Sequence, residues 1–383
     1  MSDAVGVVFG GPSPEHDVSV VTGLQAAHAL LDRGHEVVAL YWTKTGDWVS
    51  IDPRSETSDL ADGVPGGAKE LRLALGRRGG FLRKRPLGGR GVVPLDVVVN
   101  CCHGGPGEDG TLQGAFDLAG MRYTGPSQRS AMLSMDKLAF AAFAEAQGLP
   151  RLHRVGCAAG IDWIPPFSAP YIVKPRYGGS SIGIEVVKDA ESLRALVEHS
   201  VHLREGAVVE PYLPDADDLN VAIRTFPRLE VSAIEQPVRS DASRQFLSFE
   251  DKYVGREGMA GAPRELPADL PDKVVAEIKR CAEIVGRFLP VRGIVRLDFL
   301  RDGMDLYVNE VNSIPGSLAK YLWIHPPRTF HELLDDIIEE ARSLPTYHPS
   351  TEGADGGLLR KAGSIAAKLT SQRAPEGSVG QCR

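Results

Sequence analysis

Long apolar runs and paired cysteines are missing from this sequence of 383 residues. No stretch approaches the roughly 18 apolar residues that a bilayer-spanning helix needs, so the sequence predicts no membrane segment. The five cysteines are odd in number and include no CxxC pair, which disfavours disulfides and zinc and favours reduced thiols in the cytoplasm. The amino-terminal stretch lacks a basic region before its short apolar run, so we expect a first strand there and not a signal peptide.

The sequence also has no excess of basic over acidic residues. The formal net charge is -7, which argues against nucleic acid as a main partner. Basic residues concentrate at 76–91, but they lie among glycines and lack an aromatic platform. A solvated hairpin explains that run, and the composition, with 43% hydrophobic and 24% charged residues, is typical of a globular protein.

Strand and helix patterns alternate in the first third of the chain. Buried-strand patterns and helical patterns follow one another, with strands at 4–11, 35–42 and 95–102 and helices at 19–33 and 109–120. This order predicts an α/β domain with an open parallel sheet over residues 1–134.

The rest of the chain is less regular. It contains a strong helical pattern at 135–150, many short strands, and further helices at 189–199, 271–288 and 329–343. We expect α+β lobes with antiparallel sheets at 135–212 and 213–344. The remaining residues, 345–383, are rich in Gly, Ser and charge and show one short helical pattern around 358–369, so they are predicted to form a mobile tail.

Two strand patterns near the end of the second lobe carry polar residues two positions apart. The segment RLDF contains Arg296 and Asp298, and NEVN contains Glu310 and Asn312. Residues two apart in a strand share a face, so all four side chains would converge if these strands are neighbours. Two carboxylates and an amide are hard oxygen ligands that suit Mg²⁺. A cross-strand ion pair on a wet sheet face would produce the same spacing, and both interpretations stay open.

Glycine-rich loops supply further candidates. In KPRYGGSSIG, Lys174 precedes two glycines and two serines, which suits phosphate binding, although a plain hairpin has the same composition. Glu15 follows the first strand, where open α/β sheets bind ligands, and it could hold an amino group. His103 follows another strand and either faces the same crevice or is a satisfied turn residue. The segment 249–253, FEDKY, is either a lid or an ordinary exposed loop.

Taken in order, these segments resemble the D-alanine:D-alanine ligase family of the ATP-grasp superfamily. The resemblance runs over about residues 5–341 and rests on seven blocks: GGPSPEHDVS, HGGPGEDGTLQG, YTGPS...SMDK, VKPRYGGSSIG, FEDKY, RLDF and NEVNSIPG. It implies a ligase that forms a peptide bond through an acyl phosphate, with D-alanine at both positions, for peptidoglycan. It also implies ATP, two Mg²⁺ ions (with Mn²⁺ as an alternative), small-molecule amino-acid substrates, a cytoplasmic location and a homodimer.

The resemblance also implies roles for individual residues. The metal ligands would be Asp298, Glu310 and Asn312. The ATP-binding residues would be Lys137, Lys174, Gly178, Gly179, Ser180, Ser181, Glu210, Leu213, Asp218 and Lys252. The catalytic residues would be Glu15, Ser180, Tyr253, Arg296 and Gly316, with Arg296 and the Gly316 N–H at the oxyanion. Glu15, Ser180 and Tyr253 would form a hydrogen-bonded link that closes the lid over the substrate. The substrate-binding residues would be Glu15, His103, Lys320 and Tyr321.

One segment departs from the family pattern. Family members usually carry a Ser-Leu pair after the NxxPG block, and its hydroxyl and main chain receive the carboxylate of the second substrate. Here the segment reads SLAKYLWIHPP, with Tyr321 at the expected serine and Lys320 before it. A different amino-acid-like acceptor, in specialised metabolism, is therefore an alternative. A nucleotide-binding regulator without catalysis is a third hypothesis, which the retained Arg296 and metal-ligand set oppose.

Overall fold

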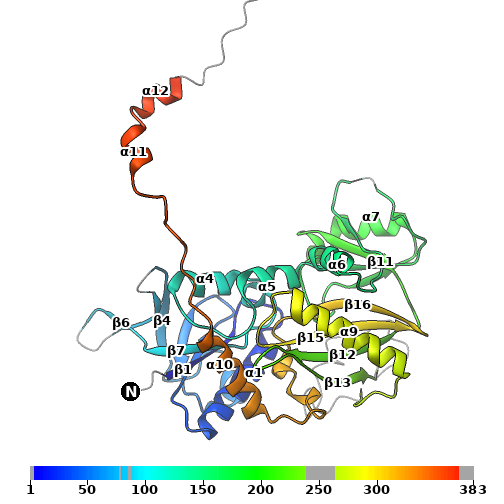
Figure 1. Cartoon of the computed structure of the whole chain (residues 1–383), viewed down its shortest axis with the longest axis horizontal. Coiled ribbons are helices and arrows are strands. Elements are labelled where there is room, and N and C mark those ends of the chain that lie inside the picture. The colour runs from blue at the N-terminus through cyan, green and yellow to red at the C-terminus, as the bar shows by residue number, and fades with distance from the viewer. Residues whose placement is uncertain (1–3, 77–78, 85–87, 162, 239–263, 371–383) are drawn as a thin grey trace, which may run out of the picture. The chain divides into compact units, whose positions relative to one another are not determined.

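The computed structural model describes residues 4–76, 79–84, 88–161, 163–238 and 264–370 (Figure 1). Contacts divide the chain into a compact unit of residues 1–346 and a second unit of residues 347–383, close to the predicted start of the tail. In the second unit the described residues form two short helices, α11 (Gly357–Lys361) and α12 (Ile365–Thr370). The mobility of the tail stays a prediction.

The amino-terminal region contains a seven-stranded sheet with the order β6-β5-β4-β3-β2-β1-β7. Its strands are β1 (Ala4–Gly10), β2 (Val37–Trp42), β3 (Trp48–Ile51), β4 (Lys69–Ala74), β5 (Gly80–Lys84), β6 (Arg90–Val92) and β7 (Leu95–Asn100). The expected parallel strands β2, β1 and β7 form one part of this sheet, and strands β3 to β6 extend it antiparallel. The sheet is mixed because the short connections after β2, β4 and β5 allow hairpins but not parallel crossovers. The described part of the basic run forms β5 and β6, with Arg83, Lys84 and Arg90 exposed, as a solvated hairpin requires.

Helices cover both faces of this sheet. Phe9 of β1 packs with α1 (His16–Asp32) and α10 (Phe330–Ser343), whereas Val8 packs on the other side with α4 (Thr111–Ala119). Gly23 lets α1 lie close to the sheet, because an added Cβ would come within 2.3 Å of Phe9 Cβ. Two short helices, α2 (Thr57–Leu60) and α3 (Gly105–Glu108), lie in the connections. Because α1 begins at His16, earlier than predicted, Glu15 stands at its amino end, just beyond β1.

The helix expected at 135–150 forms at 137–146, and a separate helix precedes it. These are α5 (Gln128–Met135) and α6 (Lys137–Ala146). Asp136 between them has an extended backbone, and its side chain accepts hydrogen bonds from the N–H groups of Leu138 and Ala139. This N-cap starts α6 at Lys137 and thereby fixes the position of that lysine.

Two antiparallel sheets follow, as expected. The first has the order β10-β9-β11-β8 and is built from β8 (Val155–Cys157), β9 (Tyr171–Pro175), β10 (Glu185–Val187) and β11 (Ala207–Pro211). The helix α7 (Ala190–His199) packs on it through Leu193 and Val197, and a short 3-10 helix, η1 (Val201–Leu203), follows.

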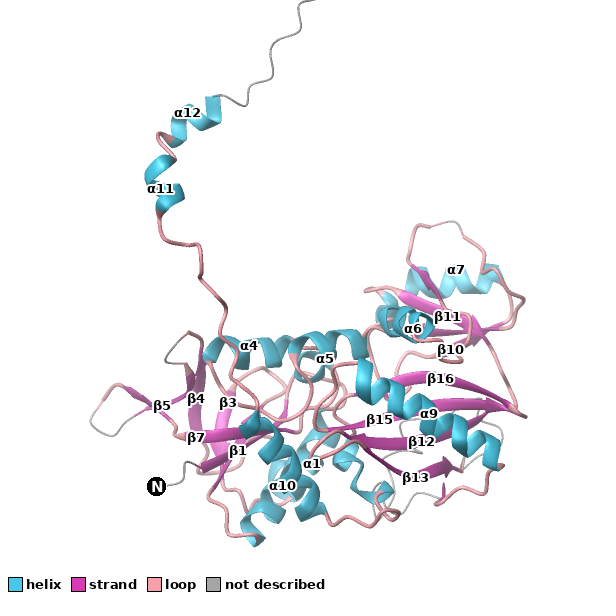
Figure 2. Ribbon diagram, in the orientation of Figure 1, coloured by secondary structure: helices cyan, strands magenta, loops and turns pink. Residues whose placement is uncertain are grey.

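The second antiparallel sheet has the order β14-β13-β12-β15-β16. Its strands are β12 (Asp217–Arg224), β13 (Glu230–Pro237), β14 (Arg264–Glu265), β15 (Ile294–Asp302) and β16 (Asp305–Asn312). The helix α9 (Asp272–Phe288) lies alongside it (Figure 2) and packs against Leu219, Leu297 and Val311. The face turned away from α9 carries the polar residues described below. The predicted lobe boundaries near residues 134 and 212 stay predictions.

Candidate active site

A row of polar side chains crosses the five-stranded sheet on the face opposite α9. Glu235, Asn220, Asp298 and Glu310 lie opposite one another on β13, β12, β15 and β16. We call these four residues the polar row. The strands RLDF and NEVN are therefore neighbours, and their side chains converge as the period-two pattern predicts.

Arg296 and Asn312 lie beside the polar row, opposite each other on β15 and β16. The Arg296 guanidinium donates two hydrogen bonds to Asp298, Nε to Oδ1 at 2.7 Å and Nη2 to Oδ2 at 2.8 Å. Asn312 Nδ2 donates to Asp298 Oδ2 at 2.9 Å. An ion pair and an oxygen-rich cluster thus exist together, and the pair runs along one strand instead of across two.

The donor atoms here suit a hard divalent cation. Two carboxylates, Asp298 and Glu310, are paired in register, and Asn312 adds an amide oxygen. Lys137 Nζ lies 3.5 Å from Glu310 Oε2, so a protein cation offsets this carboxylate's charge in the structure. The described residues contain no group of three or more His, Cys, Asp or Glu side chains that could hold a metal, so the oxygen donors here are two carboxylates and one amide.

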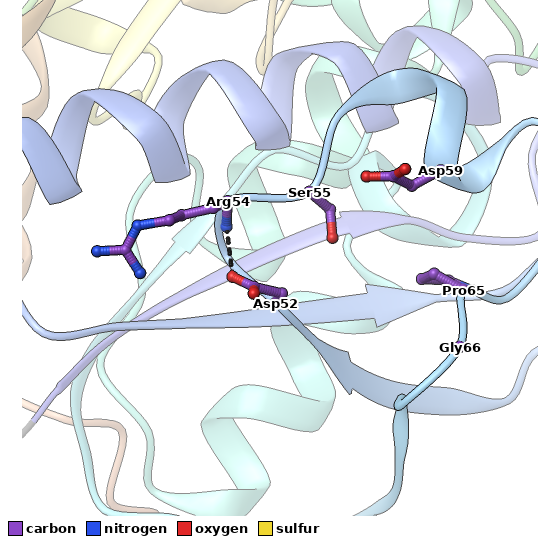
Figure 3. A pocket seen from close by; sticks show the side chains of 6 residues that line it. All are labelled: Asp52, Arg54, Ser55, Asp59, Pro65 and Gly66. Atoms are coloured by element: carbon purple, nitrogen blue, oxygen red, sulfur yellow. Dashed lines mark hydrogen bonds between the residues drawn. The ribbon is translucent and has the colours of Figure 1, made fainter.

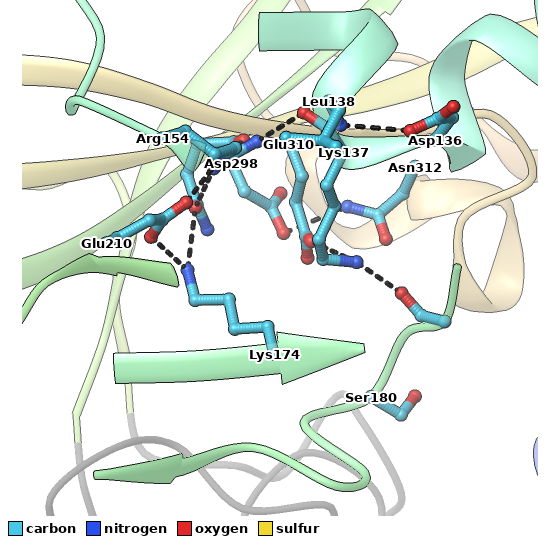
Figure 4. Close-up of polar contacts among 12 residues, drawn as sticks. Asp136, Lys137, Leu138, Arg154, Lys174, Ser180, Glu210, Asp298, Glu310 and Asn312 are labelled. Atoms are coloured by element: carbon cyan, nitrogen blue, oxygen red, sulfur yellow. Dashed lines mark hydrogen bonds and ion pairs between the residues drawn. The ribbon is translucent and has the colours of Figure 1, made fainter. Parts of the chain in front are cut away.

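A buried charge cluster lies where the two antiparallel sheets meet (Figure 4). The Glu210 carboxylate is completely buried and accepts hydrogen bonds from Arg154 Nε and, at 2.7 Å, from Lys174 Nζ. Lys174 Nζ also lies 3.3 Å from Asn309 Oδ1. Burial alone would raise the pKa of Glu210, but Arg154 and Lys174 lower it to about 2. The cluster therefore holds Lys174 extended across the gap between the sheets.

Lys137 and the glycine-serine loop contact each other. Lys137 Nζ donates to the Gly178 carbonyl, and burial lowers the pKa of this lysine while Glu310 opposes the shift. The loop joins β9 to β10 as a hairpin, with Ser180 and Ser181 in the left-handed backbone region at φ 53° and 60°. Non-glycine residues adopt this conformation at a cost, often where a loop serves a ligand.

The loop also reaches the amino-terminal region. Ser180 Oγ donates a hydrogen bond to Glu15 Oε1, across 165 residues of sequence. Glu15 is 9% exposed and lies against Gly104, where an added Cβ would come within 2.3 Å of Glu15 Oε2. Glycine at 104 therefore leaves space for this carboxylate. Two of the three residues expected to link the lid to the substrate are in contact; Tyr253, the third, and Lys252 lie outside the described residues.

Glu108 ties the end of β16 to the amino-terminal region. Its Oε1 accepts from the Ile314 N–H at 2.9 Å and from Ser313 Oγ at 3.2 Å, and its Oε2 accepts from the Gly104 N–H at 2.8 Å. Burial, with a smaller contribution from the charge of Glu15, raises the pKa of Glu108 to about 7. This carboxyl therefore holds the backbone at Gly104 and the backbone at Ile314 close together.

His103 forms a second link between the same segments. Its Nδ1 lies 2.6 Å from the Ile314 carbonyl oxygen and therefore donates, which leaves Nε2 as an acceptor for Thr22 Oγ1 at 2.8 Å. Thr22 Oγ1 accepts in turn from the Ser317 N–H at 2.9 Å. Burial lowers the pKa of His103 to about 4, consistent with a neutral ring. The histidine is the satisfied polar residue of the alternative interpretation, and its predicted substrate contact stays a prediction.

The segment that departs from the family pattern, SLAKYLWIHPP, follows the buried Gly316. A 3-10 helix, η3 (Gly316–Leu322), follows, with left-handed backbone at 317–319. Tyr321 lies beside Arg264, whose guanidinium carbon is 4.6 Å from the centre of the Tyr321 ring. Burial raises the pKa of Tyr321, and the charges of Glu235, Arg296, Arg264 and Asp298 follow in decreasing order of effect. Lys320 takes a different direction: its Nζ lies 4.7 Å from the centre of the Phe330 ring.

Two predicted nucleotide contacts lie on the segment that joins the antiparallel sheets. Glu210 is the penultimate residue of β11, and Leu213 follows that strand, before β12 of the second sheet. Because the Glu210 carboxylate is enclosed, a contact with adenine would come from its main chain. Asp218 shares the face of Asn220 on β12, so its side chain lies on the same side as the polar row.

Two family models match this chain. One, described as the D-ala D-ala ligase N-terminus, matches residues 4–126, and the other, the D-ala D-ala ligase C-terminus, matches residues 161–339. A D-alanine--D-alanine ligase of Mycobacterium sp. (strain KMS) is 32% identical over 359 residues, which cover 88% of this chain and 95% of the relative. The chain belongs to the D-alanine:D-alanine ligase family. A family member from Caldicellulosiruptor bescii is 30% identical, covering 91% of this chain and 99% of its own.

Solved ligase structures share the fold. The D-Alanine-D-Alanine Ligase from Helicobacter pylori has a TM-score of 0.69 at 24% identity and covers 91% of this chain and 100% of its own. The VanG D-Ala:D-Ser Ligase from Enterococcus faecalis has a TM-score of 0.70 at 22% identity and covers 89% and 100%. The predicted family, ATP-grasp fold and ATP-dependent ligase class are thereby confirmed. None of the described helices combines the length and apolar character that spanning a bilayer requires.

Several site residues of this ligase were not predicted. Arg154 and Asn309 hold the Glu210 cluster, and their contacts join positions up to 155 residues apart, for which local patterns give no signal. Arg264 and Glu235 lie beside Tyr321. A glutamate inside the buried strand pattern SAIEQP was the available signal for Glu235.

Two pockets lie away from these site residues. One (Figure 3) is lined by Asp52, Arg54, Ser55, Asp59, Pro65 and Gly66, all between β3 and β4. The other is lined by Arg224, Pro227, Arg228, Arg328, Glu332 and Asp336, whose arginines pair with carboxylates. Neither pocket contains a residue of the predicted ligase site.

Proposed function

We propose that this ligase joins D-alanine to D-alanine through an acyl phosphate, giving D-alanyl-D-alanine for peptidoglycan. The observation that carries the proposal is the placement of Asp298, Glu310 and Asn312 on one sheet face, with Lys137 against Glu310. Oxygen ligands beside lysines suit the phosphates of ATP and their metal ions. The relatives' names support D-alanine as the substrate.

ATP would lie between the two antiparallel sheets. The main chain of Glu210 and the side chain of Leu213 would contact adenine, and Asp218 would contact the ribose. Lys137 and Lys174 would face the phosphates, which the loop at 178–181, including Gly179, would cover. Lys174 is held ready by its hydrogen bond to the buried Glu210, so it needs little further ordering when the nucleotide binds.

The metal site fits two Mg²⁺ ions, with Mn²⁺ as an alternative. Asp298, Glu310 and Asn312 would hold them, and the ions would neutralise charge on the β- and γ-phosphate oxygens. Asn312 presents its amide nitrogen to Asp298, so its amide oxygen is directed away from that carboxylate and would be available to a metal ion.

In the first step Glu15 would hold the ammonium group of the first amino acid. An oxygen of the substrate carboxylate attacks the γ-phosphorus, the bond from phosphorus to the β-γ bridging oxygen breaks, and ADP leaves with the electron pair. Ser180 donates a hydrogen bond to Glu15. This bond orients the carboxylate and would connect the loop at 178–181 to the substrate. By the family resemblance Lys252 and Tyr253 complete the closure.

In the second step the amine of the acceptor attacks the acyl carbon. A tetrahedral oxyanion forms, the bond from carbon to the phosphate oxygen then breaks, and the nitrogen loses a proton. Arg296 and the Gly316 N–H would stabilise the oxyanion. Asp298 holds the Arg296 guanidinium through two hydrogen bonds, so the donor is already oriented when charge develops.

A second candidate keeps this mechanism and changes the acceptor. Tyr321 stands at the expected serine, and its ring lies against Arg264, which pairs with Glu235 of the polar row; this favours an altered acceptor pocket. The VanG structure, described as a D-Ala:D-Ser ligase, belongs to a protein of the same fold.

The test is ATP-dependent phosphate release with Mg²⁺ across D- and L-amino acids, singly and in pairs, with products identified by mass. We expect turnover with D-alanine alone and its dipeptide as the product. Turnover only with a mixed pair would support the second candidate, and no turnover with any pair would contradict both.

We further propose a cytoplasmic homodimer. The described cysteines, Cys101, Cys102, Cys157 and Cys281, are free thiols, as in a reducing compartment. The family resemblance suggests pairing through the amino-terminal domain. Light scattering of the purified protein would measure the mass, and a monomer at working concentrations would contradict the dimer.

A further inference from the structure

Arg264 lies at the end of the polar row farthest from Glu310. It begins β14, which pairs with β13, and its Nη1 donates to Glu235 Oε1 at 2.7 Å. Its guanidinium carbon lies 4.6 Å from the centre of the Tyr321 ring. The side chain is 13% exposed, so the charge is held in a defined place and is largely shielded from water.

The partner of Arg264 is itself fixed. Glu235 is 3% exposed and accepts a second hydrogen bond, from Asn220 Nδ2 at 3.1 Å. Asn220 lies opposite Asp298 on the next strand. Hydrogen bonds therefore link Arg264 to Asn220, which lies in register with the carboxylate that holds Arg296, and the two arginines lie on one sheet face.

The Tyr321 phenol stays neutral in this setting. Burial raises its pKa, and the charge of Glu235 adds to that shift. A neutral phenol can donate a hydrogen bond to an anion, which a phenolate cannot. Arg264 thus offers a cation, and Tyr321, whose ring it faces, offers a neutral donor.

An acceptor amino acid brings an anion that needs such a site. Its amine must reach the acyl carbon near Arg296 and Gly316, and its own carboxylate requires a partner once water is excluded. Lys137 contacts the phosphate loop, and Lys320 lies over Phe330. Arg264 instead lies at the other end of the polar row, on the side of Tyr321.

We infer that Arg264, with the Tyr321 hydroxyl beside it, receives the carboxylate of the acceptor amino acid. The inference rests on the proposed ligase function and names the group that selects the second substrate. A guanidinium has five N–H donors in a planar fork, so it can hold Glu235 and also bind a carboxylate, whereas lysine cannot reproduce the bidentate geometry. The acceptor class is thus an amino acid with a free carboxylate.

The test lets two acceptors compete in one reaction. Saturating D-alanine serves as the donor, D-alanine and D-alaninamide compete as acceptors, and mass spectrometry gives the ratio of dipeptide to dipeptide amide. We expect the wild type to favour the free carboxylate and Arg264→Gln to lower the ratio at least about tenfold. The ratio for Arg264→Lys should lie between those of the wild type and Arg264→Gln. Tyr321→Phe should lower the ratio less than Arg264→Gln does. Arg228→Gln is the matched control, because Arg228 pairs with Glu230 at the start of β13 and is 76% exposed.

A second readout separates this inference from the proposed function. Hydroxylamine attacks the acyl phosphate and releases phosphate, so it reports the first step without using the carboxylate site. Arg264→Gln should still form hydroxamate at a rate near that of the wild type. Hydroxamate formation with an unchanged product ratio in both Arg264→Gln and Tyr321→Phe overturns the inference alone. A wild type that forms no hydroxamate overturns the proposed function. If Arg264→Gln does not fold, the Arg264→Lys and Tyr321→Phe ratios decide.

Discussion

The two ends of the polar row differ in how closely they follow the family. At one end, Glu310 contacts Lys137, and both belong to blocks that match the family pattern. At the other end, Glu235 pairs with Arg264 beside Tyr321, in a segment that departs from it. Phosphoryl transfer imposes the same charges on every family member, because the phosphates of ATP are the same. The acceptor varies, so the end that would meet it is free to differ.

A connected set of strands separates these two ends. Asp298 lies between them: it would bind metal in the first step, and it holds Arg296 for the second. Changes at the Glu310 end should therefore stop turnover with every amino acid, whereas changes at the Glu235 end should alter which amine is used. The predictions below test that division, beginning with the largest expected effect.

Glu310→Ala should abolish turnover. It removes one of two carboxylates from the predicted metal site, and metal stabilisation of transferring phosphates contributes several kcal/mol, so we expect kcat to fall by at least about 10³-fold. Steady-state phosphate release measures this loss, and the melting temperature shows whether the fold is kept. Glu339→Ala, on the exposed side of α10, is the control. A Glu310→Ala protein with near-normal kcat would exclude this residue as a metal ligand.

Arg296→Ala should lower kcat by roughly 10²-fold or more, the usual effect of losing one oxyanion donor. Because the proposed donor acts in the second step, hydroxylamine trapping of the acyl phosphate should be affected less than dipeptide formation. Arg301→Ala is the control on the same strand, where Arg301 pairs with Asp217. Equal losses in both assays would assign Arg296 to the first step instead.

His103 should make stability depend on pH. Its pKa falls from 6.5 to about 4 on folding, so the unfolded chain binds a proton that the folded chain refuses. Stability is then fully present above pH 6.5 and decreases as the pH falls toward 4, by roughly 3 kcal/mol. Protonation would also remove the Nε2 acceptor that Thr22 uses.

Denaturant unfolding from pH 4 to 7 measures this effect. His103→Gln cannot titrate, so its free energy of unfolding should vary less over that window than that of the wild type. His199→Gln, at the exposed end of α7, should retain the wild-type slope. Identical slopes for the wild type and His103→Gln would mean that His103 takes up its proton equally in both states.

Local patterns predicted the parts of the site that lie on regular strands. The two-residue spacing placed Arg296 with Asp298 and Glu310 with Asn312, because the period of a strand is a local property. The mixed sheet of the amino-terminal region was not predicted, since pairing direction depends on connection length as well as on strand pattern. Helix α6 also starts at its cap, Asp136, and not where the apolar periodicity suggests.

Contacts between distant segments had no local signal. The hydrogen bond from Ser180 to Glu15 was expected only through the family blocks, and the Arg154 contacts with Glu210 and Asn309 were not expected at all. Arg264 was missed for the same reason: its importance comes from the ring and carboxylate beside it. Charged residues inside buried strand patterns, such as Glu235, are the sequence feature most useful for finding such contacts.

Substitutions at Tyr321 and at Lys320 should have different effects on acceptor preference. Tyr321→Ser removes the ring beside Arg264 and restores the family's hydroxyl, so acceptor preference should move by about tenfold toward D-alanine, the range that a change of pocket shape produces. Lys320→Ala should leave the acceptor profile unchanged, because its ammonium lies over Phe330, and it should lower stability by about 0.5–1 kcal/mol. Competition between D-alanine and other amines measures the first effect, and thermal unfolding the second. A shift in acceptor preference caused by Lys320→Ala, with none from Tyr321→Ser, would reverse the assignment and move the acceptor site away from the polar row.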